Sequence, residues 1–210
     1  MNSVKEKAYA KLNISLDVSS RREDGYHDMV MVMQTISLFD EIELKLEEGG
    51  KVRAKTNLPF IPGDERNLAV KAALKFLEAT GHEGQGMSIK IAKRVPVGAG
   101  MGGGSSDAAG VLRALNRLYG FPLSTAELEE LSCAVGSDVA FCVAGGTALA
   151  TGRGEKLQAL PPLPDCLFVV CKPEFSISTP ELFKKLDQMP LRRHPDTAGL
   201  LSAIENGELS

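Results

Sequence analysis

The sequence contains no run of apolar residues long enough to cross a lipid bilayer, which takes about 20 residues in a helix. Its opening stretch, MNSVKEKAYA, is polar and has none of the apolar core of a secretory signal peptide. These two absences predict a cytoplasmic protein that is not held in a membrane.

Basic clusters and paired cysteines are also missing. There is no long run of lysine or arginine, and the 210 residues carry a net charge of −3, which offers no electrostatic attraction to nucleic acid. The four cysteines form no CxxC pair, and no histidine stands at metal-ligand spacing from them. We therefore predict reduced thiols, no metal site built from these residues, and no nucleic-acid partner.

What the sequence does contain begins with a clean alternation of apolar and polar residues. The alternation predicts a strand over residues 8–19, with Lys11, Asn13 and Ser15 side by side on its polar face. Similar patterns predict three further strands and one helix in the first half of the chain. They are strands at 29–37 and 41–47 joined by a turn at Phe39 and Asp40, a helix at 67–80, and a strand at 87–94.

The second half is predicted to be mainly helical. Expected helices cover 106–119, a capped segment from Ser124 to about 135, and 180–191, with another beginning near Thr197. The other expected features are a break at 136–138, a strand and turn at 145–154, a linker at 161–164 and a short buried strand at 167–171. This order predicts an α+β fold with a mixed or antiparallel sheet, because the regular strand–helix alternation of a doubly wound fold is absent.

A glycine-rich stretch, VPVGAGMGGGSSDAAG at residues 95–110, separates the two halves. It lacks the lysine of the GxxxxGKS/T nucleotide loop. It contains GxGxxG, but the following helix leads to another capped helix and not to the strand of a dinucleotide-binding unit. A protein-kinase glycine loop would lie between two strands. The remaining interpretation is a glycine turn at a helix N-terminus, where free N–H groups converge on an anion such as phosphate.

This stretch resembles the PxxxGLGSSAA-type phosphate motif of the GHMP kinases. Two further stretches, AYAKLNISLDV with REDGYHDM, and later GSDVAFCVAGGTALATGRGE, are similar to one branch of that superfamily. The branch transfers the ATP γ-phosphoryl group to the 2-hydroxyl of 4-diphosphocytidyl-2-C-methyl-D-erythritol, in non-mevalonate isoprenoid biosynthesis. The resemblance implies a GHMP-kinase fold with an N-terminal domain like domain 2 of ribosomal protein S5 (1–160), followed by an incomplete ferredoxin-like C-terminal domain (161–210).

The resemblance also implies roles for individual residues, with ATP and Mg²⁺ as cofactors and a small-molecule substrate, the cytidine diphosphate-linked methylerythritol, as partner. Lys11 and Asp138 are the implied catalytic residues, and we expect them to be paired so that the ammonium keeps the carboxylate ionised. The implied ATP-binding residues are Asn67, Lys93, Pro96, Val97, Gly98, Ala99, Gly100, Met101, Gly102, Gly103, Gly104, Ser105 and Ser106. The implied substrate-binding residues are Asn13, Tyr26, His27, Thr179 and Phe183.

Within this set, Tyr26 is expected to stack on the cytosine, His27 to hydrogen-bond its edge and Phe183 to lie on its other side. Asp107 is expected to be a first-turn helix acid that points away from the phosphates. His82 and His194 match no motif and are expected on the surface.

Two departures from the family pattern keep alternatives open. Ala140 stands where the family often has proline, and nothing before Ser210 resembles the family's third, glycine-rich motif. The alternatives are another GHMP small-molecule kinase and a non-catalytic nucleotide-binding fragment. An RNA-binding module like ribosomal protein S5 is disfavoured by the net charge of −3.

Overall fold

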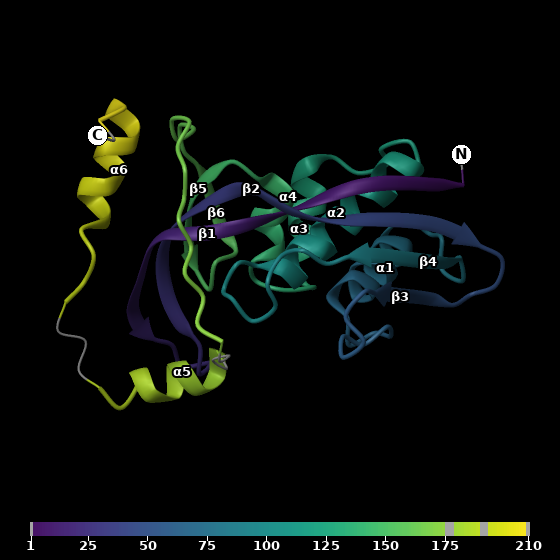
Figure 1. Cartoon of the computed structure of the whole chain (residues 1–210), viewed down its shortest axis with the longest axis horizontal. Helices are drawn as coiled ribbons and strands as arrows, with labels where there is room; N and C mark the ends of the chain where they lie inside the picture. The colour runs from purple at the N-terminus through teal and green to yellow at the C-terminus, as the bar shows by residue number, and fades with distance from the viewer. Residues whose placement is uncertain (1, 175–178, 190–192, 209–210) are drawn as a thin grey trace.

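A mixed sheet of six strands runs through the molecule (Figure 1). The computed structural model describes residues 2–174, 179–189 and 193–208. The strands are β1 (Ser3–Arg21), β2 (His27–Glu47), β3 (Val52–Thr56), β4 (Gly86–Ala92), β5 (Thr147–Gly152) and β6 (Lys156–Ala159). The pairings are antiparallel except for the parallel pair β3–β4, which confirms the predicted α+β class.

The long strand β2 organises this sheet. One edge of β2 pairs with β1, while its other edge pairs with β5 over residues 29–34 and with β4 over residues 41–47. Among the described residues, no strand pairs with residues 35–40 on that second edge. The predicted turn at Phe39 and Asp40 is wrong, because β2 continues through both residues. Aspartate is typical of turns, but Asp40 is fully buried. Its carboxylate accepts hydrogen bonds from the Lys93 ammonium and from the Arg94 N–H, in the residues that follow β4.

Helices cover one face of the sheet and leave the other open (Figure 1). The covering helices are α1 (Leu68–Ala79), α2 (Gly103–Leu118), α3 (Thr125–Cys133) and α4 (Val139–Ala144). Helix α2 lies closest to the strands because its inner face is made of small residues. At Gly110 an added Cβ would stand 2.6 Å from Ile42 Cδ1 and 3.3 Å from Ala8 Cβ, so any larger residue would have to displace the end of the Ile42 side chain.

Several of these helices were predicted from local sequence signals. The helix predicted at 67–80 is α1, and Ser124 and Glu127 form the capping box that begins α3. Helix α2 begins at Gly103, three residues before the predicted start. Three elements escaped prediction, β3, β6 and α4, since each is only four to six residues long and shows too little periodicity.

The chain beyond the sheet is more exposed. After β6 it runs extended through residues 161–172, followed by α5 (Thr179–Leu186) and α6 (Thr197–Asn206). The buried strand predicted at 167–171 is wrong. Leu167 and Val169 are 97% and 98% exposed, and no strand among the described residues pairs with this segment. Apolar residues alone cannot bury a strand that lacks a neighbour. The division at residue 160 into two domains stays a prediction.

Candidate active site

The glycine loop, defined here as residues 96–104, connects the end of β4 to the start of α2. Gly98, Gly100 and Gly102 all have positive φ angles of 66°, 71° and 68°. Ser106 N–H donates to Gly102 O (2.7 Å), as in a regular first helical bond. The N–H groups of the three residues before it therefore have no acceptor inside the helix. The loop thus presents the free amides that the anion-binding interpretation requires.

Lys11 lies directly against this loop. The pairing of β1 with β2 shifts register between Tyr9 and Lys11, and Lys11 N–H donates instead to Met101 O (3.0 Å). A Cβ added to Gly102 would stand 2.9 Å from Lys11 Cγ. Gly102 is therefore required twice, once for its φ angle and once for the space that the lysine stem occupies.

Lys11 and Asp138 form the predicted pair. Their Nζ and Oδ2 atoms are 3.4 Å apart, with side-chain exposures of 5% and 32%. Lys11 Nζ also donates to Asn13 Oδ1 (3.1 Å). Asn13, which was predicted to bind the substrate, therefore belongs to the same polar cluster. Asp138 stands at the N-cap position of α4, yet its side chain makes no capping hydrogen bond. Its carboxylate is thus partly open to solvent and available for chemistry.

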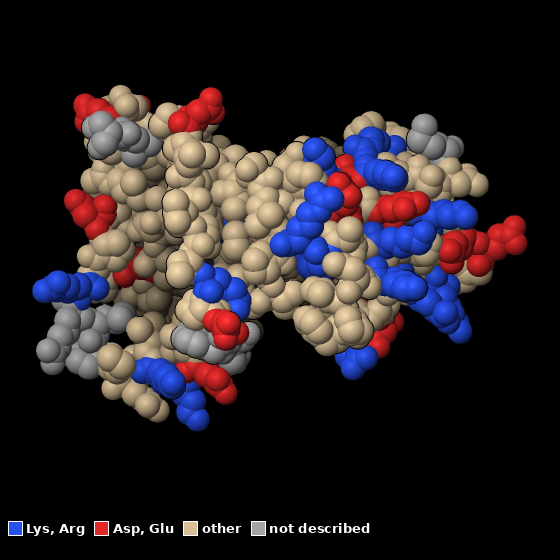
Figure 2. All heavy atoms as spheres, viewed as in Figure 1, with Lys and Arg blue, Asp and Glu red and all other residues tan. Residues whose placement is uncertain are grey.

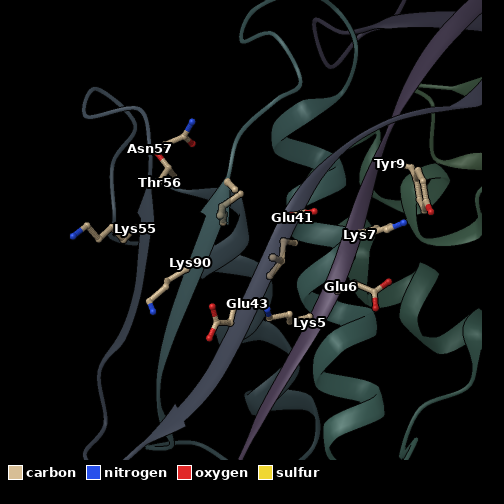
Figure 3. A pocket seen from close by; sticks show the side chains of 13 residues that line it. Lys5, Glu6, Lys7, Tyr9, Glu41, Glu43, Lys55, Thr56, Asn57 and Lys90 are labelled. Atoms are coloured by element: carbon tan, nitrogen blue, oxygen red, sulfur yellow. The ribbon is translucent and has the colours of Figure 1, made fainter.

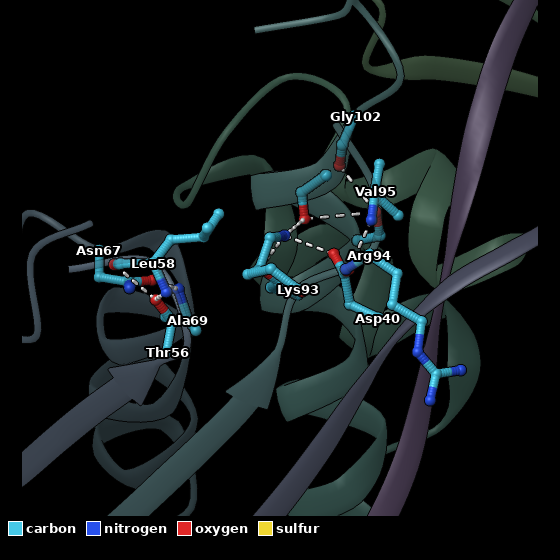
Figure 4. Close-up of polar contacts among 12 residues, drawn as sticks. Asp40, Thr56, Leu58, Asn67, Ala69, Lys93, Arg94, Val95 and Gly102 are labelled. Atoms are coloured by element: carbon cyan, nitrogen blue, oxygen red, sulfur yellow. Dashed lines mark hydrogen bonds and ion pairs between the residues drawn. The ribbon is translucent and has the colours of Figure 1, made fainter. Parts of the chain in front are cut away.

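The predicted ATP-binding residue Lys93 uses its side chain within the protein. Lys93 Nζ is buried and donates to Asp40 Oδ2, Asp107 Oδ2 (2.6 Å) and Gly103 O (3.3 Å), which uses all three of its hydrogens (Figure 4). Asp107, expected in the first turn of the helix, lies one residue beyond that turn and is buried. Burial raises the pKa of its carboxyl to about 7, although the Lys93 ammonium opposes this rise.

Two other predicted ATP ligands use their side chains within the protein. Asn67 caps α1, because its Oδ1 accepts from Ala69 N–H (3.0 Å) while its Nδ2 donates to Pro62 O (2.9 Å) (Figure 4). The Ser106 hydroxyl is buried and donates to Gly102 O (2.8 Å). Sequence reasoning missed these roles since capping and helix back-bonding use the same residue types as ligand binding. Ser105 is half-buried and lies in the first turn of α2, directly after the glycine loop.

The residues predicted to bind cytosine lie at the far end of the β1–β2 hairpin. Tyr26 is 53% exposed, and the Arg153 guanidinium lies 3.8 Å from its ring centre. His27 bonds Asp187 Oδ1 (2.7 Å) and stacks on Phe183, with ring centres 4.7 Å apart. The structure thus brings His27 and Phe183 together, and no base fits between two rings this close. The side chain of Thr179 lies outside the described residues.

The turn between β5 and β6 lies between the Lys11–Asp138 pair and Tyr26, the residue predicted to bind cytosine. A Cβ on Gly154 would lie 3.8 Å from Asp138 Oδ1, while the preceding residue, Arg153, covers Tyr26. Sequence reasoning missed Arg153, although it belongs to the GRGE stretch of a motif already identified. One turn therefore contacts both the proposed catalytic carboxylate and the proposed base-binding ring.

Two cavities differ in their relation to these residues. A cavity of about 580 Å³ is lined by Pro96 and Met101 of the glycine loop, the unpaired part of β2 and the extended segment 163–172. A larger cavity of about 850 Å³ lies on the open sheet face, where lysine and arginine gather (Figures 2 and 3). None of the predicted site residues lines the larger one. Size alone therefore does not identify the site.

The residues that the structure describes contain neither a metal-binding cluster nor a membrane-spanning helix. Within the part of the chain that the structure describes, no three His, Cys, Asp or Glu residues are grouped so that they could hold a metal ion. No helix among those residues combines the length and hydropathy needed to span a bilayer. His82 and His194 are both exposed, as predicted, and bond Thr80 (3.1 Å) and Asp17 (2.8 Å).

Known proteins share this sequence and this fold. A model of the GHMP kinases N terminal domain matches residues 67–146. The chain is 50% identical to the 4-diphosphocytidyl-2-C-methyl-D-erythritol kinase of Bacillus velezensis, over 95% of this chain and 68% of that protein. For the enzyme of the same name from Bacillus subtilis, the identity is 49% with the same two coverages.

Solved structures agree with the sequence matches. A crystal structure of 4-(cytidine 5'-diphospho)-2C-methyl-D-erythritol kinase has a TM-score of 0.74 and 34% identity, over 97% of this chain and 72% of that one. Homoserine kinase from Cytophaga hutchinsonii has a TM-score of 0.68 at 21% identity, over 99% and 69%, which shows a shared fold alone.

The fold, the glycine loop and these matches together define a GHMP kinase, a class of ATP-dependent small-molecule kinases. Within that class, the chain belongs to the family of 4-diphosphocytidyl-2-C-methyl-D-erythritol kinases.

Proposed function

We propose that this protein transfers the γ-phosphoryl group of ATP to the 2-hydroxyl of 4-diphosphocytidyl-2-C-methyl-D-erythritol, a step of non-mevalonate isoprenoid biosynthesis. The observation that carries the proposal is the Lys11–Asp138 pair, whose atoms lie 3.4 Å apart beside the glycine loop. Family membership supplies the reaction, and this pair supplies groups that could perform it.

In this proposal Asp138 orients the acceptor hydroxyl and takes its proton late, because phosphoryl transfer passes through a loose transition state. The adjacent Lys11 ammonium attracts this carboxylate and holds it in place beside the glycine loop. As the lysine is 5% exposed, water screens this attraction less than it would at the surface. Asn13 holds the ammonium from the other side (3.1 Å).

The glycine loop would hold the phosphates of ATP. A hydrogen bond to a charged acceptor contributes about 1.5–3 kcal/mol, whereas a helix dipole contributes about 0.3–2 kcal/mol. Several converging amides therefore outweigh the dipole, and the loop conformation decides affinity. Ser105, in the first turn of α2, has the hydroxyl that would add a further contact, since the Ser106 hydroxyl is already bonded to Gly102 O.

Mg²⁺ would arrive with ATP. The described residues form no carboxylate cluster able to hold the ion alone, which fits the usual binding of Mg²⁺ through substrate phosphates and few protein ligands. When bound, the ion neutralises phosphate charge.

The cytidine group would lie at the exposed ring of Tyr26, where stacking contributes about 1–3 kcal/mol. Because Arg153 covers one face of this ring, we assign the base to the other. His27 would exchange its bond to Asp187 for one to the base edge. These two residues favour a nucleotide-linked acceptor over the sugar or acid acceptors of other GHMP kinases. A cytoplasmic location completes the proposal.

The proposal is tested by measuring ADP release with ATP, Mg²⁺ and each of four acceptors, namely the cytidine-linked methylerythritol, mevalonate, homoserine and galactose. The Bacillus subtilis relative serves as the positive control for the assay. We expect turnover with the first acceptor only. Turnover with another acceptor would favour a different GHMP kinase, and ATP binding without any turnover would favour a nucleotide-binding fragment.

A further inference from the structure

Lys93 occupies the junction between β4 and the glycine loop. It is the first residue after the strand, and its side chain lies inside the protein. The side chain is 4% exposed, and its ammonium contacts two carboxylates that are 0% and 7% exposed. These carboxylates belong to Asp40 of β2 and Asp107 of α2, so a single ammonium connects three elements.

Asp40 fixes the entrance to the loop. Its Oδ1 accepts hydrogen bonds from the backbone N–H groups of Arg94 and Val95 (2.8 Å for the latter), and its Oδ2 accepts from Lys93 Nζ. Figure 4 shows these donors surrounding the Asp40 carboxylate. The carboxylate thus uses both of its oxygens to hold the chain immediately before Pro96.

Lys93 fixes the exit from the loop. Its Nζ donates to Asp107 Oδ2 (2.6 Å) and to Gly103 O (3.3 Å), both in the first two turns of α2. A Cβ added to Gly103 would stand 3.4 Å from Nζ and 3.2 Å from Val95 Cγ1. The helix start therefore lies directly on the lysine tip. Both ends of the glycine loop are tied to one buried network.

Stability alone is a poor explanation for this network. Replacing a buried ion pair by apolar residues of similar volume is often neutral or stabilising, because desolvation offsets the attraction. Here the arrangement also leaves Asp107 Oδ1 buried without a hydrogen-bond partner, which is a further cost. The Asp40–Lys93–Asp107 network therefore costs free energy of desolvation, and it lies directly behind the glycine loop. We take this as a sign that the network sets the geometry of that loop.

We propose that Lys93 is a positioning residue for ATP, which sets the orientation of the free amides at the start of α2 by tying Gly103 and Asp107 to Asp40. The inference rests on the proposed function of the glycine loop as the phosphate site. Lys93 acts from behind the loop while Lys11 contacts it from the β1 side. A displacement of about 1 Å in such a site can cost about 100-fold in rate.

The test replaces Lys93 by methionine, which keeps the length of the side chain and removes its charge. We expect the Kd for ATP, measured by calorimetry with the Mg²⁺ complex, to rise at least about tenfold, while KM for the acceptor stays within about twofold. The matched control is Lys71→Met, because Lys71 is also partly buried and donates to a carbonyl (Val135 O, 3.1 Å), but from α1. The control should keep its ATP affinity.

A second variant separates positioning from folding. Lys93→Met combined with Asp107→Asn removes one of the two carboxylates that the first change leaves unpaired, so thermal stability should recover while ATP affinity stays low. If ATP affinity recovers together with the Tm, Lys93 is merely structural and the inference is overturned. Unchanged affinity in folded Lys93→Met overturns it as well. Failure of the unmodified protein to bind ATP would overturn the proposed function itself, which is a distinguishable result.

Discussion

The two sides of the candidate site are built in opposite ways. On the phosphate side, the glycine loop is held by buried ionic groups, and its closest neighbours leave no room for even one methyl group at Gly102. On the cytosine side, Tyr26 is 53% exposed, and His27 contacts Phe183 of α5 and Asp187, the residue that follows this helix. The phosphate side is thus formed without a ligand. On the cytosine side, the proposed function requires His27 to exchange its bond to Asp187 for one to the base.

This difference follows from how each side is encoded. A tight loop requires particular backbone angles, which glycine and buried hydrogen bonds provide locally. A base-binding surface requires exposed aromatic area, which an exposed hairpin end and a helix from a distant segment can supply. We therefore expect substitutions on the phosphate side to act through geometry and those on the cytosine side to act through lost contacts.

The largest effect is expected at Asp138, where the two sides meet. Asp138→Asn keeps the size of the side chain but removes the proton acceptor, so kcat should fall about 10²- to 10⁴-fold. Steady-state ADP release measures it, with Asp165→Asn as the control because that residue is exposed outside the cluster. A kcat close to that of the unmodified protein would exclude Asp138 as the base.

The next largest effect isolates the cytosine side. Tyr26→Ala removes the stacking ring, which is worth about 1–3 kcal/mol, so KM for the cytidine-linked acceptor should rise about 5- to 150-fold. The Kd for ATP should not change, since the glycine loop is untouched. Tyr26→Phe keeps the ring and serves as the control. Equal losses in ATP and acceptor binding would contradict the separation of the two sides.

The phosphate side is tested by a pair of glycines. Gly102→Ala and Gly100→Ala both place alanine at a positive φ, which costs about 1–2 kcal/mol. Only at Gly102 does the new Cβ meet Lys11, 2.9 Å from Cγ, whereas nothing lies within 4 Å at Gly100. ATP titration should therefore show a clearly greater loss for Gly102→Ala. Equal losses would mean that contact with Lys11 is unimportant.

The smallest effect concerns pH and the buried network. Because the pKa of Asp107 is raised to about 7, the folded protein binds a proton that the unfolded chain releases near pH 4. Stability should therefore fall as pH rises between about 4 and 7, by at most about 1.4 kcal/mol per pH unit. Asp107→Asn should lack this component in urea unfolding measured across that range.

Asp64→Asn is the matched control for the pH experiment. Arg66 lowers the pKa of Asp64 to about 2, and the pKa of an unfolded aspartate lies near 4. Above about pH 5 this carboxyl is therefore ionised in both states, so its removal should not change the slope between about pH 5 and 7. Parallel pH curves for the unmodified protein and Asp107→Asn would show that Asp107 does not titrate near neutrality.

Sequence reasoning succeeded where a signal is local. The Lys11–Asp138 pair joins distant residues, and its prediction came from the family resemblance. By contrast, sequence reasoning predicted the α+β class and the capped helix at Ser124 directly, because capping and periodicity are written in neighbouring residues. It failed where a residue's role depends on a distant partner. Asp40 resembles a turn former until Lys93 is placed beside it, and Asn67 resembles a ligand until its amide is seen to cap α1.

The turn between β5 and β6 has a consequence for how such an enzyme can evolve. Gly154 lies beside Asp138 and Arg153 lies over Tyr26, so a single insertion there would disturb turnover and base preference together. A lineage that exchanges its nucleoside partner must therefore alter the hairpin end or α5 and leave this turn intact. We therefore expect base selectivity to change more readily through the hairpin end and α5 than through the turn between β5 and β6.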